Sequence, residues 1–197
     1  MLRALILGAS LIAAPVAAWA DAKTYALDPG HTEVRFIWNH AGVSDQSGRW
    51  GKVDGTVSFD PEDLAATSVS ITVDPASVNT GVSALDEHMV GPDMFDTANH
   101  PEITFTSTGA VQTGPSHAEV TGNLTIKGET HPLVLDVELL HQGAHPLGAF
   151  LDYYKGEWLG IRATGRLLRS KFGVGFAAPL TSDLIRLEIN SELKSGG

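Results

Sequence analysis

The sequence predicts an all-β protein in which eight antiparallel strands form a closed barrel or a sandwich, with one short helical insertion at about residues 81–96. Three observations support this class. Apolar and polar residues alternate along most of the chain after residue 30, which is typical of strands with one buried face. Short turn sequences separate the alternating runs, so neighbouring strands are expected to pair antiparallel. One segment instead has apolar residues at helical spacing.

The expected strands are rich in Val, Ile, Thr, Phe and Trp, the residue types that favour a pleated, half-buried surface. They span about residues 32–39, 50–60, 67–74, 102–112, 117–127, 130–141, 157–168 and 183–191. The last strand shows the pattern clearly, because Ile185, Leu187 and Ile189 alternate with polar neighbours. Turn residues such as Asp60-Pro61 and Lys127-Gly128 separate the strands.

The helical insertion lies between the third and fourth expected strands. Its apolar residues are three and four positions apart: Val82, Leu85 and Met89. This spacing predicts a short helix over residues 83–89 with one buried face. Thr80 or Ser83 is expected to cap its first turn, and Gly91-Pro92 is expected to end it. A second break, residues 143–156, is rich in Gly, Pro and aromatic residues and is predicted to be a long loop.

The first twenty residues have the form of a secretory signal peptide. Met1-Leu2-Arg3 carries one positive charge, residues 4–17 are almost uniformly apolar, and Ala18-Trp19-Ala20 matches a signal peptidase site. The apolar run is shorter than the roughly 20 residues of a membrane span, which argues against a retained anchor. We therefore expect a signal peptide at 1–20 with cleavage after Ala20, one domain at 21–197, and a periplasmic location.

The composition excludes several classes of function. The formal net charge is −10, and loss of Arg3 with the leader makes the remainder more negative. Such a surface repels nucleic acid and anionic headgroups, so we expect no nucleic-acid partner and no stable membrane insertion. The chain contains no cysteine, which excludes thiol catalysis, thiolate metal sites and iron–sulfur clusters.

The remaining polar residues form no recognisable catalytic or metal-binding motif. The eight histidines are scattered, and the closest pair in sequence, His141 and His145, lies where a strand runs into a loop. The chain has no H-E-x-x-H and no G-x-S-x-G sequence. We therefore expect no metal site, no cofactor and no catalytic residue.

The alternation leaves open what fills the barrel. An eight-stranded barrel is just wide enough to be packed with side chains or to hold one small ligand. Gly122 and Gly165, at strand centres, slightly favour a ligand, because a strand glycine can mark the close approach of one.

Several motifs, in their order and spacing, resemble the YceI family of bacterial periplasmic proteins over essentially the whole chain after the leader. The motifs are Asp28-Pro29-Gly30-His31-Thr32, Asp86-Glu87-His88-Met89, His100-Pro101-Glu102-Ile103-Thr104-Phe105, Gly122-Asn123-Leu124-Thr125-Ile126-Lys127-Gly128 and Arg169-Ser170-Lys171-Phe172-Gly173. Two positions depart from the family pattern: Leu85 replaces a usual arginine, and Lys171 replaces a usual acidic residue. The resemblance implies a lipocalin-like barrel that holds a long polyisoprenoid chain, with no established catalytic activity. It implies an isoprenoid lipid or quinone as partner and leaves a homodimer open.

On this basis we expect apolar side chains of the strands and the insertion to bind a polyprenyl- or quinone-like lipid. The expected lining residues are Phe36, Trp38, Phe59, Ile71, Leu85, Met89, Met94, Phe95, Phe105, Leu124, Ile126, Leu135 and Val137. His88, Arg169 and Ser170 are the candidates for a polar mouth. Two alternatives remain: a stress-response or interaction module with a side-chain-filled barrel, and an enzyme that acts on an apolar substrate inside the barrel.

Overall fold

The computed structural model describes residues 22–196. The expected signal peptide and its cleavage site lie outside the described residues. Within them, ten strands form one antiparallel sheet in the order β10-β9-β8-β7-β6-β4-β3-β1-β2-β5. The strands are β1 (Lys23–His40), β2 (Ser44–Trp50), β3 (Val53–Phe59), β4 (Ser68–Val73), β5 (Val78–Asn79), β6 (Ile103–Gly114), β7 (His117–Ile126), β8 (Glu129–Ala144), β9 (Glu157–Leu168) and β10 (Leu184–Ser195).

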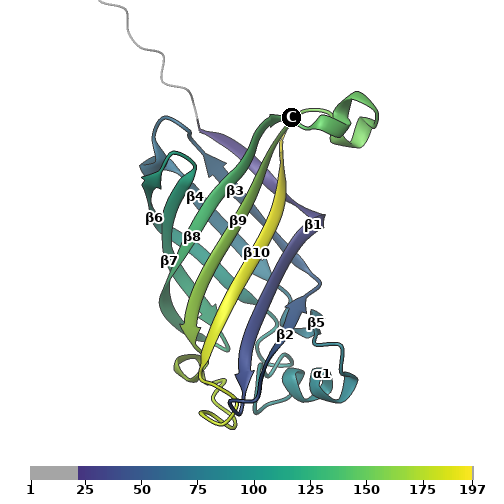
Figure 1. Cartoon of the computed structure of the whole chain (residues 1–197), viewed down its shortest axis with the longest axis vertical. Coiled ribbons are helices and arrows are strands. Elements are labelled where there is room, and N and C mark those ends of the chain that lie inside the picture. The colour runs from purple at the N-terminus through teal and green to yellow at the C-terminus, as the bar shows by residue number, and fades with distance from the viewer. Residues whose placement is uncertain (1–21, 197) are drawn as a thin grey trace, which may run out of the picture.

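The sheet closes on itself because β1 pairs with β10 as well as with β2 and β3 (Figure 1). β2 and β3 follow one another almost directly, and they pair with the second and first halves of β1 respectively. β4 and β5 pair with β3 and β2 in the same way. If β2 and β3 are counted as one interrupted strand, and β4 and β5 as another, the sheet is a closed eight-strand antiparallel barrel. This confirms the predicted class and excludes the sandwich.

The first strand differs most from the prediction. β1 begins at Lys23 rather than near residue 32, and it contains the Asp28-Pro29-Gly30-His31 sequence. These four residues interrupt the alternation, and the pairing with β10 jumps there from Leu27↔Leu193 to Thr32↔Ser191. The segment is therefore a bulge within a long strand, and turn-forming residues such as Pro and Gly concealed it in the sequence.

The helical insertion was located correctly, but its cap was not. Helix α1 (Ser83–Val90) ends at Gly91, as expected. The residue before its first turn is Val82, which gives no side-chain cap. The backbone N–H and the hydroxyl of Thr80 instead donate to Asp86 Oδ1 at 2.7 Å each. The Asp86 side chain therefore accepts hydrogen bonds from Thr80, which lies before the helix, and neither Thr80 nor Ser83 caps the first turn. The prediction of a Thr80 or Ser83 cap was wrong.

Five short 3₁₀ turns complete the structure: η1 (Leu64–Ala66), η2 (Pro75–Ser77), η3 (Pro146–Ala149), η4 (Asp152–Tyr154) and η5 (Arg169–Phe172). η3 and η4 lie in the predicted long loop, which projects from one end of the barrel as a separate excursion, whereas α1 lies at the opposite end (Figure 1). Between residues 22 and 196, none of the helices has the length and apolar character needed to cross a bilayer.

Candidate functional site

Every second residue of each strand points into the barrel, and most of these inward residues are apolar. The barrel interior is therefore apolar. On β7, Val120, Gly122, Leu124 and Ile126 are buried, while the residues that alternate with them are more exposed. Strands β8, β9 and β10 repeat the pattern on the adjoining wall. The inward rows leave two cavities, which lie along the barrel between its two ends.

The first cavity has a volume of about 340 Å³ and occupies the end of the barrel near the β6–β7 turn. Its walls are almost entirely aliphatic and aromatic, and the turn residues Pro115 and Ser116 lie at its rim with η1. A cavity of this size falls within the usual range for small-molecule sites, about 300–1,000 Å³. The described interior is therefore not completely filled by side chains.

The second cavity, of about 290 Å³, lies at the end covered by α1 and the segment after η5. Met89 and Phe95 of the insertion are buried against it, and Leu85 and Met94 pack beside them. The insertion therefore forms a wall of this cavity, as the sequence suggested. Methionine adapts easily to an irregular neighbour, which suits a flexible apolar surface.

The two cavities adjoin each other. Trp50, Ile126, Leu167 and Leu187 line both of them. The Trp50 ring packs against Phe36 with centroids 4.6 Å apart and against Phe95 at 5.7 Å. The two cavities therefore share part of their walls along the barrel.

Every residue expected to line the interior does so. The first cavity is lined by Phe59, Ile71, Phe105, Leu124, Ile126, Leu135 and Val137. The second is lined by Phe36, Trp38, Leu85, Met89, Met94, Phe95 and again Ile126. Their contact with a ligand remains a prediction.

The three candidates for a polar mouth lie close together but differ in role. His88 and Arg169 line the second cavity, and the His88 ring packs edge-on against Phe176 at 5.0 Å between centroids. Ser170 instead donates from its backbone N–H and hydroxyl to the Asp183 carboxylate, at 2.8 and 2.7 Å. Of the three, His88 has the side chain most available to a ligand head group.

Arg169 is buried, with 7% of its surface exposed. Its guanidinium donates to four backbone carbonyls of the following segment and to one hydroxyl, at distances of 2.6–2.9 Å. The carbonyls belong to Val174, Phe176, Thr181 and Ser182. Arg169 therefore fixes the loop beside the cavity, and all its donors are already used.

Sequence reasoning missed the contribution of the last two strands. Inward residues of β9 and β10 line the first cavity: Leu159, Ile161, Ala163, Leu167, Leu187, Ile189 and Leu193. The alternation of Ile185, Leu187 and Ile189 with polar neighbours already indicated an inward-facing row on the last strand. Trp50 was missed because its strand, Ser44–Trp50, is otherwise polar and contains glycine.

The two strand glycines have a different role from the one expected. A side chain at Gly122 would lie 2.4 Å from the Phe105 ring, and one at Gly165 would lie 2.7 Å from Leu135. Both glycines therefore make room for lining side chains rather than for a ligand directly.

Comparison with known proteins places the chain in context. The profile of the YceI-like domain matches residues 25–193. A UPF0312 protein of Vibrio cholerae is 35% identical over 84% of this chain and 84% of its own length. The crystal structure of a Campylobacter jejuni YceI protein superposes with a TM-score of 0.69 and 27% identity, over 81% of this chain and 90% of that one. A polyisoprenoid binding domain from Saccharophagus degradans, at 15% identity, shares the fold with a TM-score of 0.60, over 87% of this chain and 98% of that one.

Proposed function

Because the chain belongs to the YceI-like domain family, we propose that its barrel binds a long isoprenoid lipid, polyprenyl- or quinone-like, and carries it without chemical change in the periplasm. The observation that carries the proposal is the pair of adjoining apolar cavities along the barrel. The shared fold with a domain described as polyisoprenoid binding points to the same class of ligand.

The physical chemistry of such a carrier depends on shape. Burial of each CH₂ group from water is worth about 0.8 kcal/mol. An isoprenoid lipid leaves a bilayer rather than water, however, so burial alone gains little. Affinity must come from the fit of the chain to Phe105, Leu135 and their neighbours, and from a few polar groups at the mouth such as His88.

The test is mass spectrometry of the organic extract of protein purified from the periplasm without detergent. A stoichiometric isoprenoid would support the proposal and identify the ligand. An empty extract, together with no uptake of added prenyl lipid, would overturn it in favour of an interaction module. Recovery of a chemically altered lipid after incubation would instead indicate an enzyme.

A further inference from the structure

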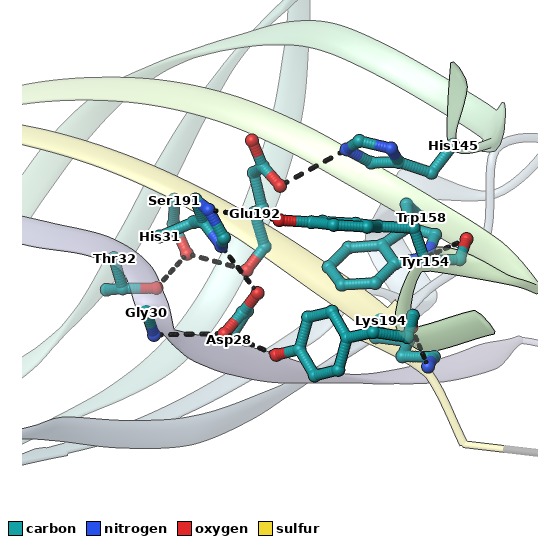
Figure 2. Close-up of polar contacts among 11 residues, drawn as sticks. Asp28, Gly30, His31, Thr32, His145, Tyr154, Trp158, Ser191, Glu192 and Lys194 are labelled. Carbon is teal, nitrogen blue, oxygen red and sulfur yellow. Dashed lines mark hydrogen bonds and ion pairs between the residues drawn. The ribbon is translucent and has the colours of Figure 1, made fainter. Parts of the chain in front are cut away.

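A cluster of polar side chains lies on the outer wall of the barrel, away from both cavities. It forms where the bulge of β1, residues 28–31, stands opposite Glu192 of β10, beside the excursion between β8 and β9 (Figure 2). Glu192 alternates with Ser191 and Leu193, which line the interior, so its side chain points outward. The cluster is therefore independent of the lipid proposal.

Asp28 is the buried member of this cluster, with 4% of its surface exposed. Its Oδ1 accepts hydrogen bonds from the Gly30 N–H and the Tyr153 hydroxyl, both at 2.9 Å. Its Oδ2 lies 2.8 Å from Nδ1 of His31. The bulge thus fixes a carboxylate oxygen and an imidazole nitrogen side by side.

Glu192 completes the set of donors. One donor atom from each of Asp28, His31 and Glu192 lies within 4.8 Å of the other two. Oε2 of Glu192 is buried and has no hydrogen-bond partner among the described residues. His145 Nε2 faces Glu192 Oε2 at 3.4 Å, and the Glu192 side chain as a whole is 37% exposed. A carboxylate oxygen without a well-aligned hydrogen bond keeps lone pairs that a positive ligand can use.

The nearby lysine does not supply that charge. Lys194 donates to the backbone carbonyl of Tyr153, and its ammonium lies over the rings of Tyr153 and Trp158 at 5.1 and 5.4 Å. His145 is constrained too, because its Nδ1 accepts from the Leu147 N–H at 3.1 Å. In the neutral ring Nε2 then carries the proton, so His145 positions Glu192 rather than binding a cation itself.

We propose that Asp28, His31 and Glu192 form a binding site for a divalent transition-metal ion of the Zn²⁺ type. Imidazole nitrogen and carboxylate oxygen are both ligands of such ions, and water would complete the coordination. With bonds of about 2.0–2.1 Å, two ligands of a tetrahedral zinc ion lie about 3.3 Å apart. Asp28 Oδ2 and His31 Nδ1 are 2.8 Å apart in a hydrogen bond, so they would separate by about 0.5 Å around the ion. The ion would replace the proton that these two atoms share.

The sequence predicted no metal site, because Glu192 is far from Asp28 and His31 along the chain and the three residues form no known metal motif. The fold brings them together through the pairing of β1 with β10. The bound ion would join the first strand to the last on the outside of the barrel.

Isothermal titration calorimetry on tag-free, chelator-treated protein tests the site. ZnCl₂ is expected to bind with 1:1 stoichiometry, and more than tenfold more tightly than CaCl₂ or MgCl₂. Glu192→Gln and His31→Gln are expected to weaken zinc binding at least tenfold. Glu192→Gln keeps the shape of the side chain, and circular dichroism checks that each variant is folded.

His100→Gln is the matched control. His100 also faces a carboxylate, with Nε2 4.0 Å from Asp96, but it lies outside the three-residue cluster. Its zinc binding is expected to equal that of the parent protein. The proposal is overturned if the parent does not bind zinc, if calcium or magnesium binds equally well, or if Glu192→Gln and His31→Gln bind zinc as the control does.

Discussion

Arg169 stabilises the mouth of the second cavity, because its guanidinium holds four carbonyls of the segment that follows it. The planar fork of arginine satisfies several carbonyls at once, and lysine has a single ammonium in its place. We expect Arg169→Lys to lower the free energy of unfolding by about 2–4 kcal/mol, since several charge-assisted hydrogen bonds are lost.

Urea denaturation followed by tryptophan fluorescence measures this loss. Lys171→Arg is a suitable control, because Lys171 lies two residues away and is exposed. A change below about 0.5 kcal/mol in Arg169→Lys, the usual range for surface substitutions, would show that the loop is held by other contacts.

The Asp28–His31 pair predicts a pH dependence of stability in the metal-free protein. Burial alone would raise the pKa of Asp28, but hydrogen bonds from His31, Gly30 and Tyr153 outweigh it and hold the pKa below its usual range. The hydrogen bond to Asp28 raises the pKa of His31, against a smaller opposing effect of burial.

The signs of the two effects differ. A raised folded-state pKa of His31 stabilises the fold below the unfolded value of 6.5, and this contribution disappears as the pH rises through the folded pKa. The lowered pKa of Asp28 stabilises the fold above 3.8, and its contribution disappears as the pH falls through the folded value. The melting temperature measured in EDTA should therefore be highest between pH 3.8 and 6.5, and should fall as the pH moves out of this range on either side. Asp28→Asn should flatten the profile, and an unchanged profile would contradict the assignment.

Two adjacent residues of strand β9 point to opposite faces of the barrel wall. Ala163 is buried and lines the first cavity, whereas the next residue, Thr164, is exposed on the outer face. A phenyl ring at 163 should occupy cavity space, so Ala163→Phe is expected to reduce isoprenoid uptake at least tenfold. It should cost about 1–3 kcal/mol of stability, the usual result of overpacking.

Thr164→Phe adds a ring of the same size to the opposite face and is expected to bind lipid normally. Fluorescence titration with a prenyl lipid compares the two variants. Equal uptake by both would mean that the first cavity does not hold the chain.

At the element level, alternation with period two made the interior predictable. It placed inward residues such as Phe105 and Leu135 correctly because one buried face forces every second residue to be apolar. It could not place β2, whose polar residues gain their order from pairing with β1. It also could not reveal that Asp28 and Glu192 lie close together, because strand register depends on long-range pairing that no local pattern encodes.

For the whole molecule, a bound ligand should raise stability by mass action. A lipid that occupies the native barrel and not the unfolded chain adds RT ln(1 + [L]/Kd), or about 2.7 kcal/mol at a hundredfold excess over Kd. The melting temperature should therefore increase with added isoprenoid, as measured by differential scanning calorimetry. A saturated fatty acid of similar length is the control for shape, and an equal shift with both would argue against selectivity for an isoprenoid.

The closure of the barrel has a consequence for how the chain folds. Among the described strands, β1 is made first during synthesis and its partner β10 is made last, and pairs such as Tyr25↔Ser195 join them. Such non-local pairing gives a high contact order, which slows folding. Until β10 emerges, β1 keeps an unsatisfied edge that invites aggregation. Truncation before Leu184 should therefore yield insoluble protein rather than a smaller barrel, because the last strand is the one that completes the wall.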